Sequence, residues 1–227
     1  MKEIENNVEM GWLVKTKGPI RTNQYNHGHI FSGTREYFKQ ITFPICPACN
    51  QENSPIMYID CSDSRLNNIN LWNNNIICIQ CHNGCGLKGK YGSPNYCWDY
   101  SNPNSPKIMN GNEPENIEGR VPKNWEFEGV EVELIPKVQR TRYRIELETR
   151  IGGEPTWIHN PLENKISIHC IICNNPMKML FQWSETNMDY IPRGIRETAG
   201  AIMGNPGINI WYGCKDCKIM AQVVEVG

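Results

Sequence analysis

Residues 166–184 read ISIHCIICNNPMKMLFQWS and residues 208–217 read INIWYGCKDC, and these two stretches decide the fold. Each joins a Cys-x-x-Cys pair to an apolar run of strand length. A Cys-x-x-Cys turn directs two thiolates at one centre, and two such turns supply the tetrahedral shell of four sulfurs that zinc prefers. The pattern therefore predicts β-structure held together by a zinc-ribbon-like site. The predicted ligands are Cys170, Cys173, Cys214 and Cys217.

The same unit occurs a second time, earlier in the chain. Residues 43–62 read FPICPACNQENSPIMYIDCS and residues 71–81 read LWNNNIICIQC, so Cys-x-x-Cys pairs again accompany apolar strands. An internal repeat of this kind indicates two pseudo-repeated halves. Matching the last pair of each copy predicts another zinc site, with the ligands Cys46, Cys49, Cys78 and Cys81. In chain order this is the first site, and the group at Cys170, Cys173, Cys214 and Cys217 is the second.

Both predicted sites are closed. Four thiolates leave no position for water or substrate, so we expect two structural zinc ions, and loss of a ligand should unfold a half rather than abolish a reaction. The chain has 11 cysteines, an odd number, and begins MKEIENNVEMGWLV, which lacks the features of a signal peptide. Metal ligands are therefore favoured over disulfides, in a cytoplasmic protein.

Three further cysteines have no place in these sites. In CHNGC, residues 81–85, either His82 or Cys85 could replace a ligand of the first site, although the repeat favours Cys78. Cys61 and Cys97 could act as nucleophiles, but this would need a base and an activating environment, and a buried thiol is the more usual state.

Two histidines, His27 and His29, are spaced to project from one side of a strand and could bind a metal. No third ligand is evident near them, so a polar loop is the simpler interpretation. No glycine-rich phosphate loop, nucleophile elbow or HExxH motif occurs in the chain.

The chain divides into three parts by composition. Residues 91–124 are crowded with Asn, Pro, Gly and Ser, which favour turns, and they predict a linker or a long surface loop. Residues 1–90 would then form an N-terminal zinc-binding half, and residues 125–227 a C-terminal one.

Most of the remaining chain has the periodicity of strands. Residues 129–135 and 142–150 alternate apolar and charged side chains, as half-buried strands do. Helical patterns are short and confined to residues 32–41 and 192–203, the second weakened by glycines. The fold is therefore predicted to be mainly β, a β-rich α+β class.

Charge and hydropathy exclude several classes of protein. Lys and Arg total 23 against 24 for Asp and Glu, which offers no global attraction for nucleic acid. Residues 137–144, KVQRTRYR, are locally basic, but acidic strands flank them and a solvated strand face is the simpler interpretation. No apolar stretch is long enough to span a membrane.

The C-terminal half resembles a known family. Residues 150–158, RIGGEPTWI, are followed by the CIIC turn, by MKMLFQW and by NIWYGCKDC. This order resembles the bacterial YwqG-like family of uncharacterised proteins and, more remotely, programmed cell death protein 2. The resemblance covers residues 150–217 well and residues 43–81 in part.

The resemblance implies a β-rich pseudo-repeated fold with a cleft between the halves and no established catalytic residue. The eukaryotic relatives are dedicated chaperones of a ribosomal protein, and some YwqG-like domains are similar to immunity proteins encoded beside toxins. Independently of the family, Gly152 and Gly153 would permit a tight turn, Pro155 would stiffen it and Trp157 would anchor it to the core.

Together these features favour a non-enzymatic, zinc-stabilised protein that binds a protein partner, either a toxin or a client. One alternative is nucleic-acid binding through the cysteine turns and the Arg140, Arg142 and Arg144 strand. The other is an enzyme that uses a cleft between the halves and one of Cys61, Cys97, His27 and His29.

Overall fold

The computed structural model describes a mainly β protein, which confirms the predicted fold class. The described residues are 11–20, 28–33, 35–81, 94, 96–111, 129–136, 148–157, 167–184 and 207–226. Their regular elements are eleven strands and two short 3-10 helices, η1 (Arg35–Phe38) and η2 (Ser64–Leu66).

All eleven strands belong to one antiparallel sheet with the order β4-β3-β2-β7-β1-β8-β9-β10-β11-β5-β6. The strands are β1 (Trp12–Pro19), β2 (Ile30–Phe31), β3 (Ser54–Ile59), β4 (Ile76–Gln80), β5 (Tyr96–Asp99), β6 (Lys107–Gly111), β7 (Val130–Pro136), β8 (Arg150–Ile151), β9 (Lys178–Ser184), β10 (Gly207–Gly213) and β11 (Ile219–Val226).

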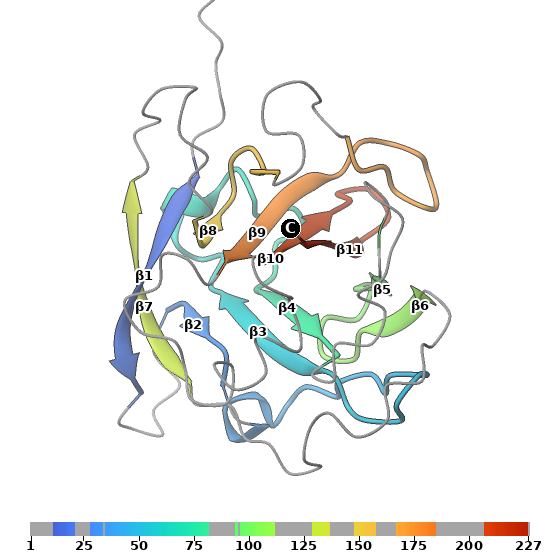
Figure 1. The fold of residues 1–227 in the computed structure, drawn as a ribbon, viewed down its shortest axis with the longest axis horizontal. Coiled ribbons are helices and arrows are strands. Elements are labelled where there is room, and N and C mark those ends of the chain that lie inside the picture. The colour runs from blue at the N-terminus through green and yellow to red at the C-terminus, as the bar shows by residue number, and fades with distance from the viewer. Residues whose placement is uncertain are drawn as a thin grey trace, which may run out of the picture.

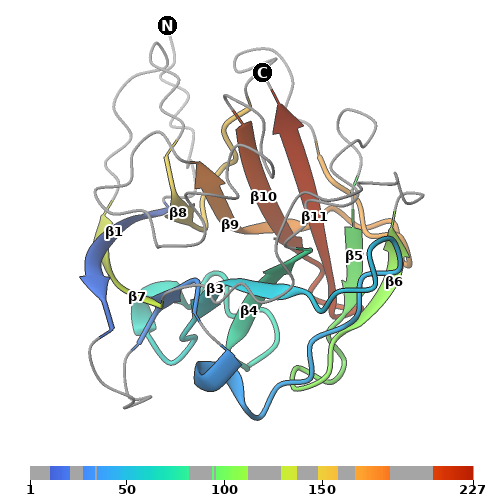
Figure 2. The same ribbon diagram turned by 60° about the horizontal axis from the view of Figure 1, so that its bottom comes forward.

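The sheet curls until its β4 end lies against β10 and β11, near the opposite end of the strand order. Figure 1 shows the strands around a common centre, with β1 and β7 on one side and β5 and β6 opposite. Figure 2 shows β4 crossing toward β10 and β11. Trp211 Nε1 of β10 donates to the carbonyl oxygen of Ile79 at 3.0 Å, and the Tyr100 hydroxyl donates to that of Ile77. Side chains therefore bond the free carbonyl groups at the edge of β4. Left unbonded, these groups would be available to pair with another chain.

The strand patterns follow the environment of each strand. In β7, Val130, Val132 and Leu134 are buried while Glu131 and Glu133 are exposed, the alternation expected of a sheet with one face in water. β10 instead has all seven residues buried. Its mostly apolar sequence, interrupted by Asn209, reflects burial on both faces.

β10 is buried on both faces because it separates two apolar clusters. On the inner face, Trp211 packs against Phe181 with ring centroids 5.4 Å apart, within the larger cluster. On the outer face, Ile208, Ile210 and Tyr212 belong to a second cluster that also contains cysteines of the C-terminal half. Cys170 and Cys214 therefore pack in the same cluster as the outer face of β10.

Several predictions about elements need correction. Residues 91–124, expected as a linker or surface loop, contribute β5 and β6, because Tyr96, Cys97 and Trp98 supply a buried strand that pairs with β11. The predicted helix at residues 32–41 is only the single turn η1. The strand at 129–135 is confirmed as β7.

Other predicted elements fall on residues that the structure does not describe. Residues 142–147 and 192–203 lie outside the described residues. β1, from the N-terminal half, pairs with β7 and β8 of the C-terminal half, so the strands of both halves join one sheet. The division into halves as separate folding units stays a prediction.

We expect Tyr100→Phe to lower the free energy of unfolding by about 1–3 kcal/mol, because it leaves the buried Ile77 carbonyl without its donor. Urea denaturation measures the change. The matched control is Tyr58→Phe. The Tyr58 hydroxyl accepts an exposed hydrogen bond from Asn75, and loss of this bond should lower the free energy of unfolding by about 0.5 kcal/mol or less. Equal effects of the two substitutions would contradict the role given to Tyr100 in closing the sheet.

Candidate metal centres

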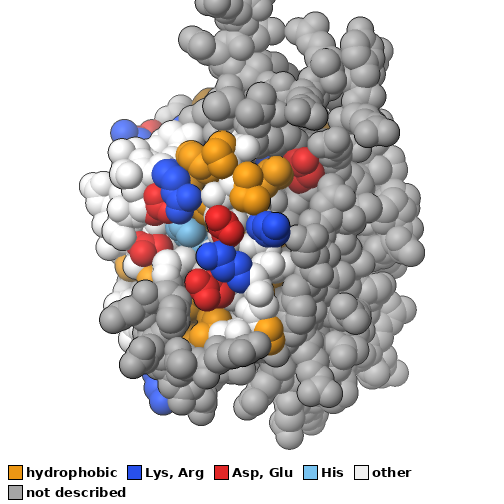
Figure 3. All heavy atoms as spheres, turned by 90° about the vertical axis from the view of Figure 1, so that its left-hand side faces the viewer, with side chains coloured by type: hydrophobic (Ala, Val, Ile, Leu, Met, Phe, Trp, Pro, Cys, Tyr) orange, Lys and Arg blue, Asp and Glu red, His pale blue; other side chains and the backbone are white. Residues whose placement is uncertain are grey.

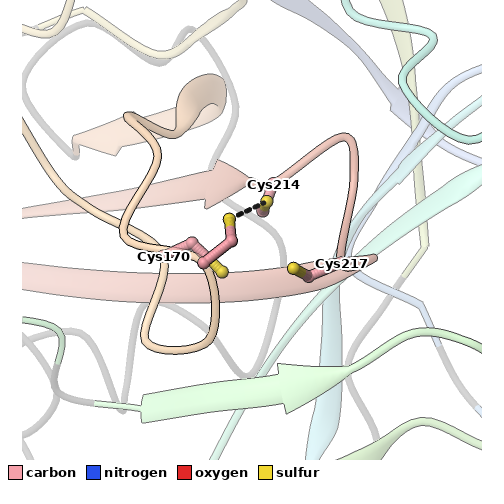
Figure 4. A group of neighbouring side chains, drawn as sticks. Cys170, Cys214 and Cys217 are labelled. Atoms are coloured by element: carbon pink, nitrogen blue, oxygen red, sulfur yellow. Dashed lines mark hydrogen bonds between the residues drawn. The ribbon is translucent and has the colours of Figure 1, made fainter.

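The second predicted site is assembled in the structure. The Sγ atoms of Cys170, Cys173, Cys214 and Cys217 all lie within 4.8 Å of one another, so the group could hold a metal ion. Figure 4 shows Cys170, Cys214 and Cys217 directed into one space from two separate turns. The sulfurs of Cys173 and Cys214, one from each turn, are 3.7 Å apart.

Each turn of this site has a defined backbone geometry. After Cys170 and Cys173, Asn174 has a φ of 59° and its N–H donates to the Cys170 carbonyl at 2.9 Å. After Cys214 and Cys217, Lys218 has a φ of 54°. A left-handed residue reverses the chain directly after the second cysteine, which brings both thiols of the turn to one side.

The hydrogen bonds that open each turn are also equivalent. The N–H of Cys170 donates to the Asn175 carbonyl at 2.9 Å, and the N–H of Cys214 donates to the Ile219 carbonyl at 2.8 Å. In both turns the partner is five residues further along the chain. The two turns are therefore the same structural unit, as the repeated sequence pattern predicts.

The first cysteine group differs from its prediction. Cys46, Cys49 and Cys81 lie together, with the sulfurs of Cys49 and Cys81 3.5 Å apart. The Cys46 turn matches the turns above: Asn50 has a φ of 56°, and the N–H of Cys46 donates to the Gln51 carbonyl at 2.7 Å. This group could also hold a metal ion, with three ligands among the described residues.

Cys78 is the predicted ligand that the structure places elsewhere. It lies inside β4 opposite Met57, is 0% exposed and belongs to the main core. Complete burial raises the pKa of its thiol well above the ordinary value. The reason for the difference is where β4 ends. Cys78 is within the strand, where its side chain points into the core, whereas Cys81 follows the last residue of the strand.

The sulfur separations fit metal ligands rather than disulfides. A tetrahedral zinc with Zn–S bonds of about 2.3 Å places its sulfurs about 3.8 Å apart, against about 2.05 Å in a disulfide. The separations of 3.7 Å and 3.5 Å lie near the first value. All ten described cysteines are free thiols.

The thiols of the second group shift one another's pKa. The backbone N–H of Asn175 lowers the pKa of Cys173, whereas the hydrogen bond to Cys173 raises the pKa of Cys217 to about 12. One thiolate therefore suppresses its neighbour. A bound cation removes this competition and allows every sulfur to coordinate as a thiolate.

The two remaining cysteines that the structure describes, Cys61 and Cys97, do not have the environment of nucleophiles. Cys61 and Cys97 are buried, and burial raises the pKa of each to about 12. Each thiol is therefore protonated near neutral pH and poorly reactive. His27, His82 and Cys85 lie outside the described residues.

His29 uses both of its ring nitrogens inside the protein. The N–H of Asp60 donates to Nδ1 at 3.1 Å, so the proton is on Nε2, which donates to Asp63 Oδ2 at 3.1 Å. Arg65 in turn holds Asp63 through its own side chain. Neither nitrogen is left for a metal or a substrate, so this group ties the loop after β3 to β2.

We expect the protein to lose stability as the pH falls below about 6.5, in part through His29. Burial lowers the pKa of His29 in the folded state. The unfolded chain therefore takes up a proton first, and the contribution of the neutral ring is complete above about pH 6.5 and declines below it. The free energy of unfolding, measured by urea denaturation, should differ less between pH 7.5 and pH 5.5 for His29→Gln than for the wild type. Identical differences would contradict this assignment.

The glycine turn predicted at residues 152–157 is confirmed. Gly152 and Gly153 have φ values of 65° and 84°, and Trp157 is buried in the outer cluster. Gln182 Oε1 of β9 accepts from the Thr156 N–H at 2.8 Å and from Arg150 Nη2 at 3.4 Å. Sequence reasoning did not assign this contact, although a glutamine within the apolar run MLFQW is a signal for it.

Charges of both signs cover the face over β1 and β7. Figure 3 shows basic and acidic side chains interspersed there, beside a few apolar ones. Lys15 and Lys17 are exposed on β1, and Glu131 and Glu133 on β7, with Lys17 and Glu133 4.0 Å apart. The described side chains of this face therefore form no continuous basic surface for a phosphate backbone. The basic segment 137–144 lies outside the described residues.

Comparison with protein-family models, with curated proteins and with solved structures finds no match. Within the part of the chain that the structure describes, no helix has the length and apolar character needed to cross a bilayer.

Proposed function

We propose that both cysteine groups bind zinc, as structural ions in a cytoplasmic protein. The support is the ligand chemistry: zinc is the metal that sets of four cysteines most often hold in proteins, and thiolate ligands persist in a reducing compartment. The sulfur separations above fit its bond length. The proposal extends to a fourth ligand for the first group.

We propose Cys85 as that fourth ligand. Cys81 follows the end of β4 as Cys214 follows the end of β10, so the second turn of the first site begins at Cys81. The next cysteine after Cys81 is Cys85, four residues on, against three residues from Cys214 to Cys217. Cys85 would complete a closed four-cysteine shell.

We further propose that the protein is non-enzymatic and binds a protein partner, as an immunity protein for a toxin or as a dedicated chaperone. The observation that carries this proposal is the exposure of isoleucines at the cysteine turns. Ile171 and Ile172, between Cys170 and Cys173, are 42% and 59% exposed, and Ile45, before Cys46, is 53% exposed. Apolar side chains on rigid, metal-held turns are suited to a protein interface.

The family resemblance stated above supports the same class of function, because the roles known for those relatives are protein binding. Cys61, Cys97 and His29 support it too, because the two thiols are buried with raised pKa values and both ring nitrogens of His29 are bonded within the protein.

A pull-down from the source cell tests the proposal. We expect the metal-loaded chain to capture a specific protein, and the double variant Ile171→Ser/Ile172→Ser to lose it at least tenfold. The matched control is Ile135→Ser on β7, an isoleucine 36% exposed away from both turns, which should retain the partner. A folded, metal-loaded wild type that captures nothing would count against protein binding. Equal capture by the double variant would count against the isoleucine turn as the surface.

A further inference from the structure

The outer face of β8, β9 and β10 carries a buried polar cluster that the proposed function does not use. Arg150 of β8 lies opposite Gln182 of β9, and Gln182 lies opposite Ile210 of β10. Tyr212 is two residues beyond Ile210, so its side chain is on the same face. Arg150 and Tyr212 are 6% and 3% exposed.

The Arg150 guanidinium is only partly satisfied by the protein. Its Nη2 donates to the Glu154 carbonyl, to Thr156 Oγ1 at 2.8 Å and to Gln182 Oε1 at 3.4 Å. Its Nε is buried and has no acceptor among the described residues, and no described carboxylate forms an ion pair with it. A buried guanidinium with an unsatisfied Nε and no ion pair among the described residues is costly, so this arrangement points to an anion.

The Tyr212 hydroxyl is a second unsatisfied group on this face. It is buried and has no hydrogen-bond partner among the described residues. Burial raises the pKa of Tyr212 well above its ordinary value, and the nearby Arg150 guanidinium acts in the opposite direction. The hydroxyl therefore keeps its proton near neutral pH and can donate it to an acceptor.

Acidic neighbours limit the positive potential of the cluster. Burial lowers the pKa of Arg150, and Glu148 and Glu154 partly oppose this effect. Glu154 and Glu225 likewise add to the raised pKa of Tyr212. These carboxylates would repel an anion, so we expect weak binding that depends on directed hydrogen bonds rather than on net charge.

We propose that Arg150 Nε and the Tyr212 hydroxyl bind a small oxyanion, a carboxylate or a phosphate, beneath the glycine turn. The left-handed Gly152 and Gly153 bring residues 154–156 back over the guanidinium, which fixes its orientation from the Nη2 side. Arg150 lies near enough to Tyr212 to act on its pKa and is on the same face of the sheet, so one small oxyanion could accept from both groups. This inference goes beyond the proposed protein binding and does not depend on it.

Thermal unfolding of the metal-loaded full chain tests the proposal, with sodium phosphate and sodium acetate compared against sodium chloride at equal ionic strength and pH. At ten times its dissociation constant, a bound anion should raise the unfolding temperature by about 3–6 °C. A response to phosphate alone, to acetate alone or to both would support the site and identify the class of oxyanion. No shift with either anion would overturn it.

Tyr212→Phe separates a ligand role from a merely buried hydroxyl. In chloride the variant should unfold at the same temperature as the wild type or higher, because an unsatisfied polar atom is removed. It should lose most of the anion-dependent shift. Arg150→Lys, which keeps the charge but loses the planar fork, should lose the shift as well, whatever its basal stability. Shifts in Tyr212→Phe equal to those of the wild type would overturn the proposal.

Discussion

Cys214→Ser will remove one of two metal ions per chain and destabilise the fold by on the order of 5 kcal/mol or more. The effect is large because Cys214 shares its site with three other thiols and because its turn lies directly after β10, the strand between both apolar clusters. Elemental analysis and urea denaturation of the purified variant measure the two losses.

The matched control for this substitution is Cys97→Ala. Cys97 is buried in the same outer cluster as Cys214 but is not part of the candidate metal group. The control should keep both metal ions and lose only about 1 kcal/mol of stability, as expected for a small buried side chain. A Cys214→Ser protein that retains two metal ions would show that the four cysteines are not a ligand set.

Cys85→Ser will remove the other metal ion, whereas Cys78→Ala will not. Cys81 already lies with Cys46 and Cys49, and Cys78 points into the main core. We expect Cys85→Ser to destabilise the protein by several kcal/mol, because three thiolates hold zinc less tightly than a closed shell. Metal content of the two variants decides between the cysteines.

Two outcomes would contradict the assignment of Cys85. Metal loss in Cys78→Ala, with a normal content in Cys85→Ser, would restore the ligand set predicted from the repeat. Metal loss in His82→Ala but not in Cys85→Ser would assign the fourth position to His82, the other alternative within residues 81–85.

The cysteine turns were predictable because their structure is local. In each cysteine turn, the residue after the second cysteine has a left-handed backbone conformation, and a hydrogen bond closes the turn within five residues. These residues are Asn50, Asn174 and Lys218. The strands beside them were predictable for the same reason, since apolar runs and alternation record burial directly. Three of the four predicted ligands of the first group and all four of the second are brought together.

The structure places Cys78 apart from the other three cysteines, because matching two similar strings by spacing does not take account of where each strand ends. Within IICIQC the first cysteine is still in the strand, whereas within WYGCKDC the strand ends before the first cysteine. The position of a strand end depends on its pairing partner, here β3, and spacing alone does not define it.

Contacts between residues far apart in the chain could not be predicted from local sequence patterns. The bond from Trp211 to the Ile79 carbonyl joins residues 132 positions apart, and it exists only because the sheet curls. The same is true of β5, whose pairing with β11 turns part of a polar, turn-rich segment into a buried strand. Local composition marked the turns around β5 but not its partner.

Metal content of the purified wild-type chain tests the central claim most directly. Elemental analysis should find two zinc ions per chain, and a chelator under denaturing conditions should release both and expose eight thiols that were protected in the folded protein. A chain that folds without metal, or one whose paired cysteines prove to be disulfides, would contradict the account.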